Sequence, residues 1–199
     1  MMKRKMAVAL AVFAIGVAPL SLMAQMAPPG PLEDDLYNWM AGKWEGATES
    51  SMGKFNDEME VDWDLEHQFV NMHYKSKIAE TDPAKLEEIA KAMGMTKEQV
   101  QMPYKGVGYM TINPQTKEYI GYWFGSIRDI SVGKGTREGN KITMTWEGGP
   151  MGSEMRTIEK AGEDKLVMTF EAKDPQGNVM KGTTTMMRKA KKAKADKKS

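Results

Sequence analysis

The sequence contains no cysteine and only two histidines, His67 and His73, among its 199 residues. Without cysteine the chain has no disulfide, no thiol nucleophile and no thiolate metal ligand. With two histidines and no H-x-H or H-E-x-x-H spacing, nothing in the sequence supports a Ser-His-Asp triad or a histidine metal site. We therefore predict no catalytic residue and no metal site, and favour a binding protein over an enzyme.

Long apolar runs are also scarce, and the one at the N-terminus predicts export. Lys3-Arg4-Lys5 precedes an apolar run over 6–23, and small residues allow cleavage after Ala24, which is typical of a secretory signal peptide. The alternative is an uncleaved anchor helix, which needs about 20 apolar residues; here a glycine and a proline interrupt the run. We predict a signal peptide over 1–24, a periplasmic or secreted protein, and no transmembrane span after signal removal.

The formal net charge of +1 conceals two oppositely charged parts. Residues 25–187 contain 18 lysines and arginines against 26 acids, whereas 188–199 contain seven basic residues and one acid. A like-charged run without large apolar residues cannot bury surface, so we predict a disordered basic tail over 189–199. Because the preceding domain is acidic, we predict no nucleic-acid partner. A proline-rich linker is predicted over 25–31.

The most regular segment of the chain is 58–67, which alternates between apolar and acidic residues. Its apolar members are Met59, Val61, Trp63 and Leu65, and the acids between them are Glu60, Asp62, Asp64 and Glu66. Side chains of a strand point alternately to opposite faces, so this pattern predicts a strand with one buried face. Weaker alternation recurs around Ile142 and Leu166.

Turn residues divide the rest of the domain, 32–188, into about ten such segments. Strands are predicted over 43–50, 57–67, 69–79, 104–112, 117–126, 128–136, 140–148, 153–160, 164–173 and 178–188. A short helix is predicted after residue 32, and a helical insertion over 82–101, where Pro83 and the Thr96/Gln99 capping box mark helix starts. The insertion is either a mobile lid or a fixed cap. Closure of the sheet removes its edges, so we predict an all-β class with an antiparallel barrel of about ten strands.

Two motifs resemble known families. The segment 39–46, Trp-Met-Ala-Gly-Lys-Trp-Glu-Gly, resembles the G-x-W entry of the calycins, the lipocalin-like barrels. That resemblance implies that Trp44 closes the barrel beneath a basic residue of the last strand, a position that Arg188 matches. Segments 104–109 and 113–124 are similar to a bacterial family of unknown function numbered 1579, which implies a lipocalin-like barrel and no established activity.

A barrel of this size leaves room for a ligand, and we predict that it binds a small apolar molecule or a lipid. The predicted cavity residues are Met59, Val61, Trp63, Leu65, His67, Tyr109, Tyr122, Trp123, Phe124, Trp146 and Phe170. Whether they line a hollow interior or fill it stays open at this point. The 20 methionines lack dense M-x-M repetition, so we expect them to pack the interior rather than bind copper.

Two further functions are kept as alternatives. Gly42, Trp44 and Gly46 match the G-x-W-x-G element of haem-binding barrels of the nitrobindin type, and His67 would face inward if its strand continued without a bulge. Those barrels hold iron through a histidine in their C-terminal part, where this chain has none, so no cofactor is predicted. A haem protein or enzyme using His67 is one alternative, and an envelope structural or interaction protein acting through its surface or basic tail is the other.

Overall fold

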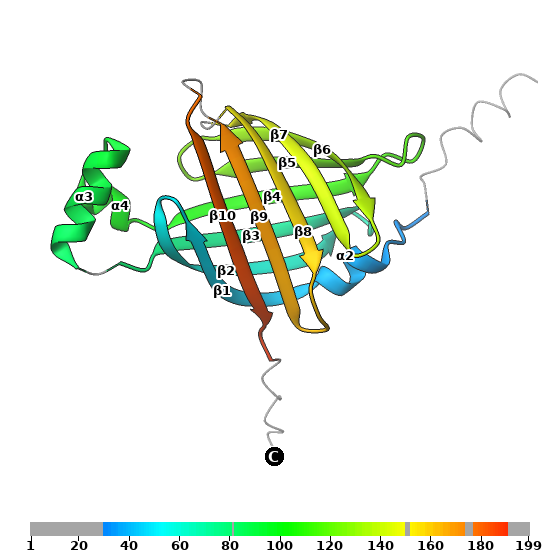
Figure 1. Cartoon of the computed structure of the whole chain (residues 1–199). Helices are drawn as coiled ribbons and strands as arrows, with labels where there is room; N and C mark the ends of the chain where they lie inside the picture. The colour runs from blue at the N-terminus through cyan, green and yellow to red at the C-terminus, as the bar shows by residue number, and fades with distance from the viewer. Residues whose placement is uncertain (1–29, 81, 150–151, 174–176, 191–199) are drawn as a thin grey trace, which may run out of the picture. The chain divides into compact units, whose positions relative to one another are not determined.

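The computed structural model describes residues 30–80, 82–149, 152–173 and 177–190. The predicted signal peptide lies outside these residues, as do most of the predicted linker and basic tail. Within the described part, ten strands form one closed antiparallel barrel (Figure 1). A short helix, α2, precedes the barrel, and two more helices, α3 and α4, follow the third strand. The predicted all-β barrel fold with its two helical additions is confirmed.

The bounds of most elements lie close to the predicted ones. The helices are α2 (Asp35–Met40), α3 (Pro83–Met93) and α4 (Lys97–Gln101). The strands are β1 (Gly42–Ser50), β2 (Gly53–Asp64), β3 (Phe69–Ile78), β4 (Tyr104–Ile112), β5 (Tyr119–Gly125), β6 (Ile130–Glu138), β7 (Lys141–Gly149), β8 (Gly152–Lys160), β9 (Lys165–Lys173) and β10 (Val179–Arg188). The largest difference is in β2, which begins four residues before its predicted start and ends three residues before its predicted end.

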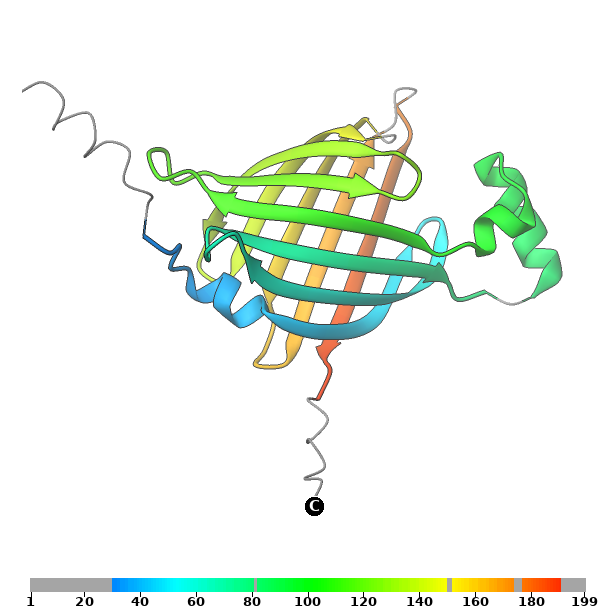
Figure 2. The ribbon, with the colours of Figure 1, turned by 180° about the vertical axis from the view of Figure 1, so that it is seen from behind.

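Each strand pairs with the next in sequence, and β1 pairs with β10 to close the barrel. The closing ladder runs from Trp44 opposite Arg188 to Ser50 opposite Gly182. This up-and-down order gives the barrel two distinct ends, visible in Figures 1 and 2. The plug end carries α2 and the turns after β2, β4, β6 and β8. The mouth end carries the turns after β1 and β5 and the α3–α4 insertion.

Helix α2 covers the plug end because its sequence is capped and amphipathic. The Asp34 carboxylate accepts a hydrogen bond from the Tyr37 amide at 2.8 Å and so caps the helix start. Leu36, Tyr37 and Met40 are buried and belong to the main barrel core. The helix thus supplies the apolar floor of the barrel.

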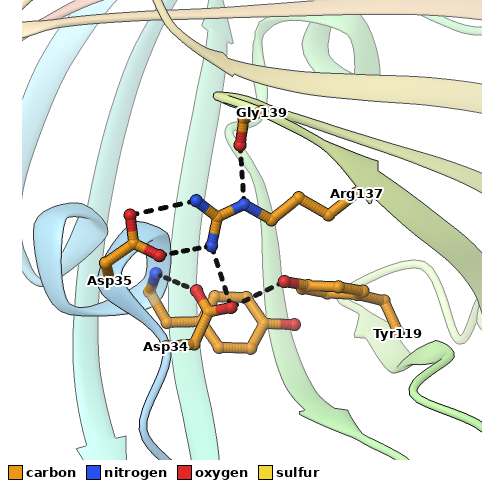
Figure 3. Close-up of polar contacts among 6 residues, drawn as sticks. Asp34, Asp35, Tyr119, Arg137 and Gly139 are labelled. Atoms are coloured by element: carbon orange, nitrogen blue, oxygen red, sulfur yellow. Dashed lines mark hydrogen bonds and ion pairs between the residues drawn. The ribbon is translucent and has the colours of Figure 1, made fainter.

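Arg137 of β6 fastens α2 to the barrel wall (Figure 3). Its guanidinium donates hydrogen bonds to Asp34 at 3.0 Å and to Asp35 at 2.6 and 3.0 Å, and its Nε donates to the Gly139 carbonyl at 2.7 Å. The Tyr119 hydroxyl donates to the same Asp34 carboxylate at 2.6 Å. The contacts with Asp34 and Asp35 join residues 85 to 103 positions apart, so they fix the plug to the closed sheet.

The α3–α4 insertion forms its own small core at the mouth end. Leu86 and Ala90 of α3 and Val100 of α4 are buried together with Ile78, with Phe55 of β2 packed alongside. The predicted helix starts are present, with Pro83 in the first turn and a Thr96/Gln99 capping box.

In the described part of the chain, no helix has the length and apolarity needed to span a membrane.

Candidate functional site: the mouth half of the barrel interior

The interior of the barrel changes character from one end to the other. Toward the plug end it is filled by apolar side chains, including Trp44, Val61, Val70, Tyr119, Ile142, Leu166 and Met186. Toward the mouth end the inward positions carry polar and aromatic groups, including Thr48, Asp57, Tyr74, Tyr104, Trp123, Glu154, Arg156, Phe170 and Thr184. Any specific chemistry inside the barrel therefore belongs to its mouth half.

The plug end is sealed by Trp44 and Arg188. The indole of Trp44 is buried and donates a hydrogen bond from Nε1 to the Met40 carbonyl at 2.8 Å. The guanidinium of Arg188 lies 4.2 Å from the centroid of the Trp44 ring and also donates to the Ala41 carbonyl at 2.7 Å. This places the two residues together in the arrangement that the calycin resemblance implies.

Glycines create the space in which the interior aromatic rings lie flat against the wall. A Cβ added at Gly106 would come within 2.0 Å of the Trp123 ring. Trp146 lies in the same way over Gly121 and Gly133, and Phe170 over Gly182. The function of these glycines is therefore to make room for ring faces, which line three sectors of the interior with flat apolar surface.

A buried hydrogen-bonded group spans β1, β2 and β10 in the mouth half. The Thr48 hydroxyl donates to Oδ2 of Asp57 at 2.6 Å and also contacts the hydroxyl of Thr184. Asp57 keeps only 2 % of its surface exposed, and its Oδ1 accepts no hydrogen bond within the described structure. Burial, followed by the nearby Asp57 carboxylate, raises the pKa of the Tyr74 hydroxyl well above its ordinary value. Tyr74 is therefore a neutral donor in this site.

A second polar chain connects β5, β4 and the β5–β6 turn. The indole Nε1 of Trp123 donates to the Tyr104 hydroxyl at 2.6 Å, and that hydroxyl donates to Oδ2 of Asp129 at 2.7 Å. Burial raises the pKa of Tyr104, so this hydroxyl also stays protonated. These two hydrogen bonds hold the Trp123 ring in place against Gly106 and Gly108.

Arg156 supplies a positive charge to the mouth half. Its Nε donates to Oε1 of Glu154, two residues earlier on β8, at 2.6 Å. Burial opposes the charge of the guanidinium, but Glu154 more than offsets this effect, so the pKa of Arg156 lies above its ordinary value. The charge of Arg156 also acts on the hydroxyls of Tyr74 and Tyr104. The guanidinium thus remains charged and acts electrostatically on both tyrosines.

A small cavity of about 20 Å³ marks the boundary between the two halves. It is lined by Met72, Gly108, Met110, Trp123, Trp146, Arg156, Ile158 and Met168. This volume admits about one water molecule. The interior is accordingly mostly packed, and three of the residues around the cavity are flexible methionines.

The larger hollow of the molecule lies elsewhere. It is an open groove of about 490 Å³ lined mainly by outward-facing residues of β1, β8, β9 and β10, among them Glu49, Met155, Glu171 and Lys181. Lys181 and Glu171, both in its lining, form an ion pair at 2.7 Å. This groove is open to solvent, unlike an enclosed ligand site.

Six of the predicted cavity residues face the interior: Met59, Val61, Trp63, Trp123, Trp146 and Phe170. Trp63 lies at the plug end, where its Nε1 donates to Asn38 of α2 at 2.9 Å. Trp123, Trp146 and Phe170 belong to the mouth half. The predicted set therefore divides between the floor of the barrel and the candidate site.

The inward orientation predicted for Leu65 and His67 is wrong. The alternation of β2 stops at Asp64, and residues 65–67 form a turn with positive φ angles. Leu65 is consequently 58 % exposed, and His67 stacks on the Trp63 ring at the plug end with 3.8 Å between centroids. This position does not support the alternative of a haem or a catalytic site at His67 inside the barrel.

The inward orientation predicted for Tyr109, Tyr122 and Phe124 is also wrong. Neighbouring residues of a strand face opposite sides, so Trp123 cannot share a face with Tyr122 and Phe124. Tyr122 and Phe124 are 43 % and 47 % exposed on the outer surface, and Tyr109 pairs with Tyr122 there. Gly121 and Gly125 alternate with Trp123 and therefore share its face, which indicates that Trp123 points inward and its two neighbours point outward.

Sequence reasoning missed Arg156, Glu154, Tyr74 and Tyr104. A usable signal existed in β8, because Ile158 faces inward and places Arg156 and Glu154 on the same face by alternation. Charged residues in a strand ordinarily face solvent, so residue type alone does not indicate this inward position. Among the described residues there is also no cluster of three or more histidine, aspartate or glutamate side chains able to hold a metal ion.

Comparisons with known proteins extend the description of the fold. No family model and no curated protein sequence matches the chain, so the resemblance to family 1579 stays a prediction. Among solved structures, the S-type phycobiliprotein lyase CPES from Guillardia theta is similar with a TM-score of 0.54 and 11% identity, over 78% of this chain and 92% of that chain. Protein Rv2717c from M. tuberculosis gives 0.52 and 11%, over 79% and 99%.

A bovine odorant-binding protein crystallised with its natural ligand is more distant, with a TM-score of 0.36 and 12% identity over 82% of this chain and 79% of that chain. The fold that this chain shares with the first two structures is a closed antiparallel β-barrel. At these identities the likeness shows the fold alone.

Proposed function

We propose that this protein is an exported lipocalin-like barrel that binds a small, largely apolar molecule in the mouth half of its interior. The observation that carries the proposal is the lining of the small cavity at the boundary of the mouth half, here called the central cavity. Aromatic faces of Trp123 and Trp146 and the side chains of three methionines surround it, and a single cation, Arg156, adjoins it. Apolar walls with a few fixed polar groups are the usual composition of small-molecule sites.

Ligand entry requires the cavity to enlarge, and its lining allows this. Met72, Met110 and Met168 have unbranched side chains with three rotatable bonds, which adopt new rotamers at small cost. The sealed plug end stays fixed by Arg188 and Arg137, so the ligand enters from the mouth end. The prediction of export supports access to ligands of the cell envelope.

The proposal is tested with the neutral fluorescent probe N-phenylnaphthylamine. The wild-type protein is expected to bind it, with an increase in probe emission that saturates. Met168→Trp fills the cavity and is expected to abolish this signal. Met155→Trp is the matched control, since Met155 lies on the neighbouring strand and is exposed, and it should bind the probe like the wild type.

Native mass spectrometry provides a second test, on protein purified from a host that exports it. A co-purified small molecule that is lost in Met168→Trp would support the proposal. Equal probe binding by wild type and Met168→Trp, with both proteins folded, would contradict it.

A further inference from the structure

We infer that Arg156 binds the anionic group of an amphipathic ligand whose apolar part lies against Trp123, Trp146 and Phe170. This inference rests on the proposed function and adds the chemical class of the ligand. Arg156 is singled out because it is the cation that lines the central cavity.

The hydrogen-bonding capacity of Arg156 is only partly used. Among the described residues Glu154 alone accepts a hydrogen bond from it, at Nε. The terminal nitrogens Nη1 and Nη2 therefore keep their donors available, and 34% of the side-chain surface is accessible. A guanidinium edge with two free nitrogens matches the two oxygens of a carboxylate or of a similar anionic group.

The Tyr74 hydroxyl fits the same partner. The charge of Arg156 acts on this hydroxyl, which keeps its proton. A protonated phenol can turn its O–H toward an anion beside the guanidinium. The proton of Tyr104 is already donated to Asp129, so the donors offered to a ligand are those of Arg156 and Tyr74.

The carboxylates of the mouth half do not favour a cationic ligand. Asp57 and Asp129 each use Oδ2 within the protein, accepting from Thr48 and Tyr104 respectively. Their remaining Oδ1 atoms are buried, so a ligand cannot reach them without rearrangement. Glu154 is held by Arg156 itself. The accessible charged group is therefore the guanidinium.

The aromatic faces locate the apolar part of the ligand. Arg156 lies opposite Phe170 of β9 and opposite Met144 of β7 in the barrel ladder. Trp123 and Trp146 line the same cavity as Arg156. A molecule whose anionic end contacts Arg156 consequently places its apolar body against flat ring surfaces.

Two probes with the same aromatic skeleton test the inference: anilinonaphthalene sulfonate, which is anionic, and N-phenylnaphthylamine, which is neutral. The wild-type protein is expected to bind the anionic probe more tightly. Arg156→Met should weaken binding of the anionic probe by about tenfold or more, from the loss of charge-assisted hydrogen bonds, while binding of the neutral probe changes little. Lys134→Met, on the outer face of β6, is the matched control and should leave both affinities unchanged.

A second variant keeps the test decisive if Arg156→Met does not fold. Glu154→Gln retains Arg156 and removes the competing negative charge, so it should tighten binding of the anionic probe only. A ratio of the two affinities that is the same in wild type, Arg156→Met and Glu154→Gln would overturn the inference, as would tighter binding of the neutral probe by the wild type. If neither probe binds, or Met168→Trp binds both, the proposed function itself fails.

Discussion

The guanidinium of Arg188 lies 4.2 Å from the centroid of the Trp44 ring, and the two residues face each other in the ladder that closes the barrel. The same guanidinium donates to the Ala41 carbonyl, which ends α2. One side chain thus links the first strand, the last strand and the plug helix.

Arg188→Met should therefore destabilise the fold by about 2 kcal/mol, from the lost stacking and hydrogen bonding. Arg188→Lys should rescue little of this loss, because an ammonium group lacks the planar fork. Urea unfolding monitored by tryptophan fluorescence measures the free energy of unfolding of both variants. Lys189→Met is the control: its ion pair with Glu45 is exposed and should change stability by well under about 1 kcal/mol. Equal effects of the Arg188 and Lys189 substitutions would contradict this account of the seal.

Gly106→Ala should destabilise the barrel by about 1–3 kcal/mol, because the added methyl group meets the Trp123 ring at 2.0 Å. The displaced indole should also lose its hydrogen bond to Tyr104 and shift the tryptophan emission. Gly162→Ala provides the comparison, since its nearest neighbour would be 3.6 Å away, and should be tolerated. An unchanged unfolding midpoint in Gly106→Ala would show that Trp123 is not seated as described.

The contacts of Arg137 with Asp34 and Asp35 at the plug end predict an acid-dependent loss of stability. Hydrogen bonds from Arg137 lower the pKa of Asp35 below its ordinary value of 3.8. A carboxyl group with a lowered folded-state pKa contributes stability above its ordinary pKa and loses it as the pH falls below that value. The free energy of unfolding of the wild type should therefore decrease as the pH falls from about 5 to about 2.

Arg137→Gln should make that pH dependence shallower and should also lower stability at neutral pH. Asp34 would lose the same partner and keep only its bonds to Tyr119 and the helix start. Denaturation curves across the pH range check both effects. A parallel decline in wild type and Arg137→Gln would mean that other carboxyl groups account for the acid response.

Replacing 82–101 with a short flexible linker should leave the barrel folded, because the insertion has its own core and Ser76 of β3 already pairs with Tyr104 of β4. Loss of cover over Phe55 and Ile78 should cost about 2 kcal/mol or less. We expect N-phenylnaphthylamine to exchange faster in this variant, since both uncovered residues lie at the mouth. Stopped-flow dissociation of the probe measures this, and an unchanged rate would identify the insertion as a fixed cap.

The fold was predictable because its determinants are local. Alternation in β2, the turn residues between strands and the capping residues of α3 and α4 each specify one element, and closure follows from the number of strands. The contact between Trp44 and Arg188 was accessible only through the resemblance, since 144 residues separate them in the chain.

The candidate site was harder to predict because it depends on which side chains of each strand point into the barrel and on the residue at which each strand ends. Leu65 and His67 were misplaced because nothing in the alternation showed that β2 stops at Asp64. Aromatic character predicts an inward position for Tyr122 and Phe124, whereas alternation from Trp123 places both on the outer face, where they lie. Arg156 was overlooked since a charged residue in a strand ordinarily faces solvent, and only its neighbours in β8 reveal the inward orientation.

The claim that a ligand occupies the mouth half of the interior is tested most directly by thiol labelling, which the absence of native cysteine makes clean. Ser131 and Val132 are neighbours on β6. Ser131→Cys places a thiol in the barrel interior, and Val132→Cys places one on the outer surface. Bound anilinonaphthalene sulfonate should slow modification of the cysteine at 131 by a small methanethiosulfonate reagent and leave the one at 132 unaffected. Equal protection of both positions, or of neither, would contradict an interior site.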